Sequence, residues 1–202
     1  MNSRLIAGIG INDADYPVTG CTLYATWRDM IQRCYNPNVQ KKYPSYKGCT
    51  VSKEWHKFST FRVWMLLQDW QGNCLDKDIL VLNNTEYGPA TCCFVPNSIN
   101  NLFHKDRVKD NSLPQGVFFV RNSKKYRAQI FHKGKTQHLG CFKSADFAHK
   151  VYCKAKARLF REAAAVIKTD HIAIALIEHA KRYESHAQWK DLRKKGGKED
   201  NE

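Results

Sequence analysis

Residues 75–103, LDKDILVLNNTEYGPATCCFVPNSINNLF, hold two short apolar segments separated by a polar turn. Residues 75–81 and 92–95 each have the composition of a short strand. The tripeptide Asn83-Asn84-Thr85 between them is a turn signal. A proline ends the second segment, and residues 97–103 then predict the start of a helix, capped near that proline or Asn97. The stretch therefore predicts a strand–loop–strand–helix unit.

Two helical patterns precede this unit. Residues 22–35 have apolar side chains at helical spacing, and Asn36-Pro37 ends that pattern. A second set recurs every three or four residues and comprises Trp55, Phe58, Phe61, Trp64 and Met65. We expect these aromatic side chains to form a buried core rather than a platform for stacked bases.

The positive charge of the chain is concentrated in its second half. The 202 residues include 33 Lys and Arg against 19 Asp and Glu, which gives a net charge of +14. Residues 1–105 hold 11 basic and 8 acidic residues, whereas residues 113–160 hold 11 basic residues and one acid, Asp146. We therefore expect a near-neutral aromatic domain, a boundary near residues 104–113, and a basic domain with a polyanionic partner, nucleic acid first.

Composition also excludes some classes of protein. No segment approaches the ~18–20 consecutive apolar residues of a membrane span, and no glycine repeat of the collagen type is present. No signal-peptide pattern is evident, so we expect reduced cysteines rather than a disulfide framework. No C-x-x-C pair occurs among the eight cysteines, so we expect no structural zinc. A dispersed site of Cys34, Cys49 and either Cys92 or Cys93 is the alternative to buried thiols.

An ordered set of landmarks over residues 22–103 resembles the HNH endonucleases of phages, which are free-standing, homing-type nucleases. The landmarks are Trp27-x2-Met30-x2-Arg33, Gly48-Cys49-x-Val51, Glu54-Trp55-x2-Phe58, Leu75-Asp76-Lys77, Tyr87-x-Pro89 and Cys92-x-Phe94. The resemblance implies a ββα-metal unit in which a His activates water, an Asn positions that His, and one divalent cation, Mg²⁺ or Mn²⁺, stabilises the phosphorane.

The chain departs from this family where the base is expected. Asp76-Lys77 stands in place of Asp-His or His-Arg, and neither alignment retains an imidazole. Thr91 stands where the orienting Asn is expected, whereas Asn100 matches the metal-binding residue of the helix. The resemblance thus implies a metal site of Asp76 and Asn100. A solvated strand end with a capping Asn is the alternative.

Further candidates surround this metal site. Asp78 is expected on the same strand face as Asp76, as a second carboxylate. Asp76, Lys77, Asp78 and His104 are therefore the candidate catalytic residues. His104 is the candidate base because it follows Asn100 by one helical turn, and His56 is the alternative base.

The basic half predicts a sheet followed by helices. Residues 116–121, 125–131 and 135–139 are short strand patterns joined by polar turns. Ser144 is a suitable N-cap for a helix that runs to about residue 165. Residues 170–189 form a further amphipathic helix pattern, and residues 190–202 are a highly charged tail.

Residues 113–160 resemble an AP2 domain. The motifs are Leu113-Pro114-x-Gly116-Val117, Lys125-Tyr126-Arg127-Ala128-x-Ile130, Gly134-Lys135, His138-Leu139-Gly140-x-Phe142 and Ala145-x2-Ala148. The resemblance implies a three-stranded antiparallel sheet, backed by one helix, that reads the major groove of DNA. Phage HNH nucleases often carry such a domain after the nuclease unit, so the two resemblances support each other.

The AP2 resemblance also assigns residues to the DNA. The DNA-facing sheet residues would be Phe118, Val120, Arg127, Gln129, Phe131, Thr136 and His138. Among them, Arg127 and Gln129 have the side chains that bind guanine and adenine in bidentate fashion. Lysines expected at turns would contact phosphates, namely Lys124, Lys125, Lys133 and Lys135. The alternative is a basic surface that only keeps the chain soluble.

These patterns predict an α+β chain with three parts. An HNH-like nuclease domain with flanking helices occupies residues 1–105, an AP2-like sheet and helix occupy residues 106–165, and a helix with a charged tail occupies residues 166–202. We expect a metal-dependent endonuclease that binds double-stranded DNA, not a membrane, in the cytoplasm of a phage-infected bacterium. The alternative is a catalytically silent DNA-binding protein of the same descent, acting as a regulator or counter-defence factor.

Overall fold

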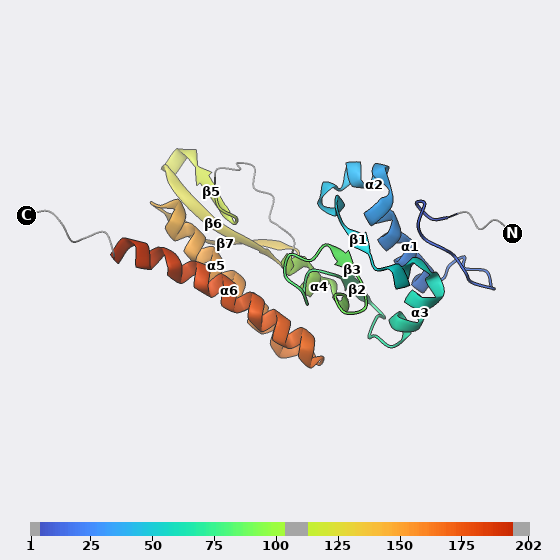
Figure 1. The fold of residues 1–202 in the computed structure, drawn as a ribbon. Coiled ribbons are helices and arrows are strands. Elements are labelled where there is room, and N and C mark those ends of the chain that lie inside the picture. Colours follow the sequence, from blue (N-terminus) through green and yellow to red (C-terminus); the bar gives the residue numbers. More distant parts are fainter. Residues whose placement is uncertain (1–4, 104–112, 196–202) are drawn as a thin grey trace, which may run out of the picture. The chain divides into compact units, whose positions relative to one another are not determined.

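The computed structural model describes residues 5–103 and 113–195, which form two compact units, Met1–Asn97 and Ser98–Glu202 (Figure 1). Both units combine helices with short strands, which confirms the predicted α+β class. The division between the units precedes residue 105, where the composition placed the end of the first domain. The expected boundary segment, residues 104–113, lies outside the described residues except for its last position.

The first unit consists of short helices and two small sheets. Its helical elements are α1 (Thr22–Tyr35), α2 (Pro37–Lys42), η1 (Pro44–Tyr46), η2 (Lys53–His56) and α3 (Phe58–Leu66). Its parallel sheet pairs β1 (Thr50–Val51) with β3 (Glu86–Tyr87), and its antiparallel sheet pairs β2 (Asn73–Asp76) with β4 (Cys93–Pro96). After β4 come α4 (Asn97–Asn100) and η3 (Asn101–Phe103), so the predicted strand–loop–strand–helix order is confirmed.

Aromatic side chains form the core of the first unit, as their spacing predicted. Trp27 of α1 is fully buried, and its indole Nε1 donates to the backbone oxygen of Trp55 over 2.7 Å. The Trp55 ring meets Phe61 of α3 edge-on, with ring centroids 5.0 Å apart. Because the indole donor is paired, Trp27 can be buried without loss of a hydrogen bond.

The second predicted helix is divided into η2 and α3. The backbone nitrogen of Ile11 donates to the oxygen of His56 over 2.8 Å, and the nitrogen of Phe58 donates to the oxygen of Ile11 over 3.0 Å. This pairing holds Lys57 in an extended conformation, with φ −91° and ψ 132°. The helix therefore starts only after Lys57, although the apolar spacing continues across it.

The first strand of the strand–loop–strand–helix unit is shorter than predicted. We expected it to cover residues 75–81, but β2 ends at Asp76. The Asp76 carboxylate accepts hydrogen bonds from the backbone nitrogens of Asp78 and Ile79, which turns the chain. Asp76 and Asp78 therefore do not share one strand face, and that prediction is wrong.

The second unit contains a three-stranded antiparallel sheet and two long helices. Its remaining elements are β5 (Val117–Val120), η4 (Arg121–Ser123), β6 (Lys125–His132), β7 (Lys135–Phe142), α5 (Ala145–Val166) and α6 (Asp170–Lys195). The strands lie in the order β5-β6-β7, as the sequence predicted. The predicted cap is confirmed too, because the Ser144 hydroxyl accepts from the backbone nitrogen of Phe147.

One face of this sheet packs against α5 (Figure 1). Val117 and Ala128 on the sheet and Ala148 on the helix form the centre of the contact, and all three are fully buried. Tyr152 of α5 is also fully buried and lies over the backbone of Gly116, just before β5. Gly116 has a φ of +77°, and a Cβ atom there would lie 2.0 Å from the Tyr152 ring. Only glycine fits this position.

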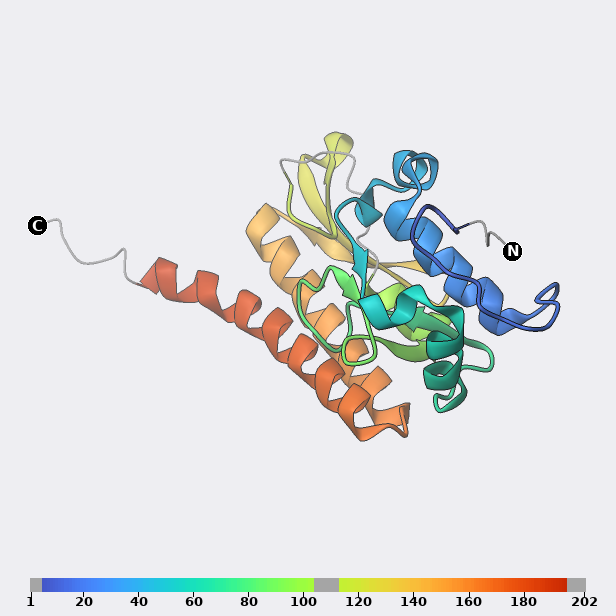
Figure 2. The ribbon, with the colours of Figure 1, turned by 45° about the vertical axis from the view of Figure 1, so that its right-hand side comes forward.

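The two long helices lie side by side in both views (Figures 1 and 2). Arg161 of α5 donates two hydrogen bonds of 2.9 Å to the carboxylate of Glu184 on α6. Phe103 of η3 packs edge-on against Phe160 of α5 and His179 of α6, with centroids 5.1 and 4.8 Å apart. Within the described residues, neither these helices nor any other combines the length and hydropathy needed to cross a membrane.

We predict that Gly116→Ala destabilises the second unit much more than Gly134→Ala does. Both glycines have a similar φ, +77° and +75°, but a Cβ atom on Gly134 would meet nothing within 4 Å. Gly134→Ala should therefore cost ~1 kcal/mol of backbone strain, and Gly116→Ala at least ~3 kcal/mol because the Tyr152 ring must move. Native-state hydrogen exchange of the β6 amides measures both losses. Equal losses would contradict the packing described here.

Candidate functional site

Asp76 closes a tight turn at the end of β2. Its side chain is buried, and Oδ1 accepts from the backbone nitrogens of Asp78 over 2.7 Å and Ile79 over 3.0 Å. Burial raises the pKa of the Asp76 carboxyl above its ordinary value of 3.8, and the two backbone hydrogen bonds act in the opposite direction. The carboxyl is thus already engaged in holding its own loop.

Lys77 is buried next to this turn, with 7% of its surface exposed. Its ammonium donates to Asp78 Oδ1 over 2.6 Å and to the backbone oxygen of Asn84 over 3.1 Å. Burial alone would lower the pKa of Lys77, but the hydrogen bond and charge of Asp78 outweigh it, and the pKa lies above 10.5. The side chain is therefore a cation at neutral pH and not a general base.

The amide that holds Lys77 is Asn84. Its Nδ2 donates to the backbone oxygen of Lys77 over 2.8 Å and to that of Glu86 over 2.6 Å. Thr91, at the position where the orienting Asn was expected, donates instead to the backbone oxygen of Glu86 over 2.8 Å. Sequence reasoning missed Asn84 because an amide in a polar turn is typical of any loop. We call Asp76–Ile79 together with Asn84 the Asp76 turn.

Of the other predicted residues that the structure describes, Asp78 alone belongs to the Asp76 turn. Asp78 lies beyond the strand and forms an ion pair with Lys77. Asn100 lies at the end of α4, in the second compact unit, whereas Asp76 belongs to the first. His104 lies outside the described residues. The alternative base, His56, has its Nε2 3.0 Å from the backbone oxygen of Val51.

Buried thiols lie in the core of the same unit. Burial raises the pKa of Cys34 and of Cys92 to about 12, and it also raises the pKa of Cys49 and of Cys93. These thiols therefore keep their protons at neutral pH. Among the residues that the structure describes, no group of three or more His, Cys, Asp or Glu side chains is arranged to hold a metal ion.

The sheet of the second unit presents seven predicted DNA-facing residues on one side. Pairing in register places Phe118 opposite Arg127, Gln129 opposite His138, and Phe131 opposite Thr136. Val120 has the same orientation as Phe118, two residues away. Val117, Ala128 and Ile130, which alternate with this set, are buried on the side of α5. We call the surface of these residues the outer face: Phe118, Val120, Arg127, Gln129, Phe131, Thr136 and His138.

A β-bulge in β7 determines which residues reach the outer face. Ala128 pairs with Gly140 and Gln129 pairs with His138, so Leu139 is an extra residue in β7. If β7 had no bulge, strict alternation from His138 through Leu139 would place Gly140 on the outer face. With it, Cys141 is the next outward side chain after His138.

The bulge requires a glycine and places three functional groups together. Gly140 has a φ of +133°, and a Cβ atom there would lie 2.7 Å from the Phe142 ring. Cys141 pairs in register with Arg127, and its Sγ is 3.5 Å from Nε2 of His138. Sequence reasoning missed Cys141 because the side-chain alternation that indicates a sheet face breaks at a bulge.

Four lysines lie at the ends of the strands, all exposed to solvent. Lys124 and Lys133 occupy turns, with left-handed φ values of 51° and 49°. Lys125 and Lys135 are the first residues of β6 and β7. The sequence holds no Asp or Glu from residue 113 to residue 145. The outer face therefore has basic side chains at its ends and hydrogen-bonding side chains at its centre.

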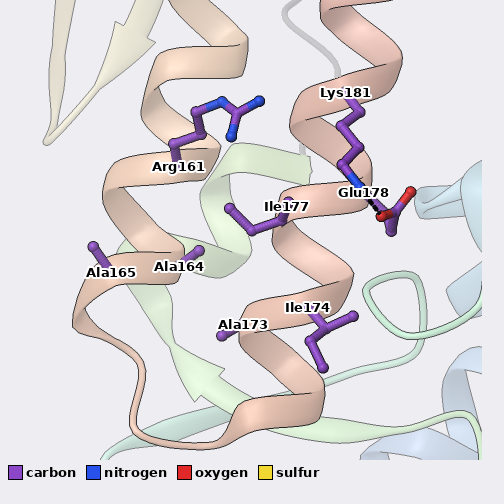
Figure 3. Close-up of a pocket in the computed structure, with 8 residues that line it drawn as sticks. All are labelled: Arg161, Ala164, Ala165, Ala173, Ile174, Ile177, Glu178 and Lys181. Carbon is purple, nitrogen blue, oxygen red and sulfur yellow. Dashed lines mark hydrogen bonds and ion pairs between the residues drawn. The ribbon is translucent and has the colours of Figure 1, made fainter.

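A hollow between α5 and α6 has a different character (Figure 3). Its volume is about 440 Å³, and its lining is mostly aliphatic, including Ala164, Ala173 and Ile177. The charged residues around it are engaged, since Lys181 forms an ion pair of 2.6 Å with Glu178. This hollow fits the packing groove of two helices better than a site for a polar ligand.

Comparisons with known proteins identify no relative of this chain. No family model matches it, and no match occurs among the curated proteins or the solved structures. The Asp76 turn and the outer face are therefore the two surfaces from which a function can be inferred.

We predict that Asp76 stabilises the first unit through its hydrogen bonds and not through its charge. Asp76→Ala leaves two backbone nitrogens without their acceptor and should cost ~1–3 kcal/mol. Asp76→Asn keeps an acceptor oxygen and removes the buried charge, so it should lose less stability at neutral pH. Urea unfolding followed by tryptophan fluorescence measures this unit, because four of the five tryptophans precede residue 71.

The pH dependence of the same variants follows from the raised pKa of Asp76. Because folding raises the pKa, the stability of the wild type relative to Asp76→Asn is largest below the ordinary value of 3.8. It is lost as the pH rises through the folded pKa. A wild type that gains stability over Asp76→Asn with rising pH would contradict this reading of the turn.

Proposed function

We propose that this chain binds double-stranded DNA through the outer face of its three-stranded sheet. The observation that carries the proposal is a sheet surface with exposed Arg127 at its centre, lysines at its ends and no acidic residue within its strands. A surface of this kind releases counterions from phosphates when it binds, which is the main source of affinity for DNA.

The geometry of β6 supports contact with the major groove. This groove is about 12 Å wide and accepts β-strands as well as helices. Alternate residues of a strand lie ~6.6 Å apart, close to the ~6.8 Å spanned by two base-pair steps. Arg127, Gln129 and Phe131 therefore have the spacing to meet successive pairs of base edges. Phe131 is 46% exposed, and its ring suits a thymine methyl group.

The lysines then suit the phosphates on each side of the groove. Lys124 precedes β6, and Lys133 follows it in the hairpin turn, so the two ammonium groups lie beyond opposite ends of the strand. Phosphate contacts fix the orientation of a protein on the duplex, and base contacts then give its sequence preference. The resemblance of residues 113–160 to an AP2 domain, which binds DNA with such a sheet, supports the same assignment.

The second candidate function is metal-dependent cleavage of DNA by the segment that runs from β2 through α4. It is favoured by one observation, the order β2–β4–α4 with Asp76 at the end of the first strand, which resembles the ββα-metal unit. The Asp76 turn fits a divalent cation poorly, because the Lys77 ammonium pairs with Asp78, and Oδ1 of Asp76 accepts two backbone hydrogen bonds. Binding without cleavage is therefore the better supported function, and it suits a regulator or counter-defence factor.

We predict that Arg127→Ala weakens duplex binding by roughly 10-fold or more, since a bidentate arginine contributes ~1–3 kcal/mol. The matched control is Arg158→Ala, which removes an exposed arginine of α5 that pairs with Glu162. Lys133→Ala should make the plot of log binding constant against log salt concentration less steep, reducing the magnitude of its negative slope by ~1. Fluorescence anisotropy with a labelled duplex at several salt concentrations measures both effects. Equal weakening by the two arginine variants would rule out the outer face as the binding surface.

We predict no nicking of supercoiled plasmid by the wild-type protein with either Mg²⁺ or Mn²⁺, under conditions where the plasmid is bound. Gel electrophoresis of the plasmid after incubation gives the result. Asp76→Ala and Asn100→Ala are tested beside it, with Asp76→Asn as the folded control. Nicking by the wild type that disappears in these variants would instead establish the nuclease, with Asp76 and Asn100 in its site.

A further inference from the structure

The outer side of the sheet carries an accessible thiol. The structure describes all eight cysteines, and Cys141 alone is exposed. Five thiols are buried, and the other two, Cys21 and Cys74, are partly exposed. Covalent modification of a protein thiol requires access for the reagent, and it proceeds through the thiolate. Cys141 is therefore the thiol with the best access.

Two groups that can take part in a reaction of Cys141 lie beside it. Nε2 of His138 lies 3.5 Å from Sγ, within the distance at which an imidazole accepts the thiol proton. Arg127 is the cross-strand partner of Cys141, which places the two Cβ atoms ~5 Å apart on one side of the sheet. A proton acceptor and a cation thus lie beside the same exposed sulfur.

The chain contains an internal comparison for this pair. Cys153 of α5 also has an imidazole next to it, with Nε2 of His149 3.4 Å from its Sγ. Cys153 is only 1% exposed, so a dissolved reagent cannot reach it in the folded protein. Both cysteines have a neighbouring imidazole, but only Cys141 is accessible. A comparison of their reaction rates therefore measures the effect of access to the sulfur.

The charge around Cys141 selects the reagent. Lys125, which pairs with Val120, and Arg127, beside the sulfur, give this side of the sheet a positive potential, since residues 113–145 hold no Asp or Glu. A positive surface raises the local concentration of small anions at low ionic strength. A low-molecular-weight disulfide that carries carboxylates, such as glutathione disulfide, meets this requirement.

We propose that Cys141, activated by His138, is a site of reversible modification by anionic disulfides of the glutathione class, and that the adduct blocks the outer face. The second half of this proposal depends on the proposed DNA binding. The Cys141 proton moves to Nε2 of His138, and the thiolate attacks one sulfur of the disulfide. The S–S bond breaks, and the departing thiolate takes the proton back from the imidazolium. Cys141 is oxidised to a mixed disulfide, one half of the reagent is reduced to a thiol, and added thiol reverses the exchange.

The adduct would change both the shape and the charge of the outer face. The attached group lies beside Arg127 and His138, where the sheet would otherwise approach base edges. It also brings carboxylates into a surface whose strands have none. Like charges placed against DNA phosphates oppose binding, so modification should lower duplex affinity.

The first test is the rate of adduct formation in the full-length native protein with glutathione disulfide, followed by mass spectrometry of its peptides. Cys141 should react at least ~10-fold faster than Cys21, Cys74 or Cys153, and Cys141→Ser should give no adduct at that rate. His138→Asn should slow the reaction of Cys141 with both anionic and neutral disulfides. Lys125→Ala should slow only the anionic one, because Lys125 pairs with Val120 on the outer face and lies two residues from Arg127. In urea, where the fold is lost, Cys141 should react at the same rate in the wild type and in the His138 and lysine variants. Equal rates for Cys141 and Cys21, or a wild-type rate in His138→Asn, would overturn the modification site.

The second test compares duplex affinity before and after modification. The adduct should bind roughly 10-fold more weakly, and dithiothreitol should restore the initial affinity. The affinity of Cys141→Ser should not respond to glutathione disulfide. An adduct that binds DNA as well as the unmodified protein would overturn the blocking role. Absence of binding by the unmodified protein would instead overturn the proposed function, while the mass spectrometry would still decide the modification site.

Discussion

The ring of Tyr152 lies directly on the backbone of Gly116, and the second unit depends on this contact. It sets how closely α5 approaches the first strand of the sheet, because any side chain at residue 116 would occupy the space of the ring. One turn earlier in α5, Nδ1 of His149 lies 2.9 Å from the backbone oxygen of Gln115 and fixes the same approach. With one side of the sheet covered in this way, the opposite side is left for solvent or a ligand, and it carries Lys125 and Arg127.

The parts of the fold with regular periodicity could be predicted from the sequence. The helix over residues 22–35, the three strands of the second sheet and the Ser144 cap all follow from local spacing and capping rules, and the structure has each of them. The ends of β2 and α3 could not be predicted in this way. Asp76 ends its strand through side-chain bonds to the backbone, and Lys57 is extended because of Ile11, 46 residues away in sequence. Neither set of hydrogen bonds can be recognised from the spacing of the apolar residues.

The candidate sites show the same division. The alternation of β6 and the AP2 resemblance together indicated the side of the sheet that holds Arg127 and Gln129. The order of residues could not show that Lys77 is buried against Asp78, since a charged residue at the end of a short strand is usually solvated. It also could not show that Asn84 reaches back seven residues to hold Lys77. The burial and hydrogen bonds of polar side chains are thus the part of this protein that only its three-dimensional structure reveals.

The position of Phe103 bears on how such a protein can be assembled from parts during evolution. The basic composition starts after residue 105, yet Phe103 already belongs to the second unit and covers the rings of Phe160 and His179. A gene fusion made where the composition changes would transfer the sheet and helices without this aromatic cover. A segment that carries the complete second unit therefore begins at residue 98. By composition alone, that position would be assigned to the end of the preceding domain.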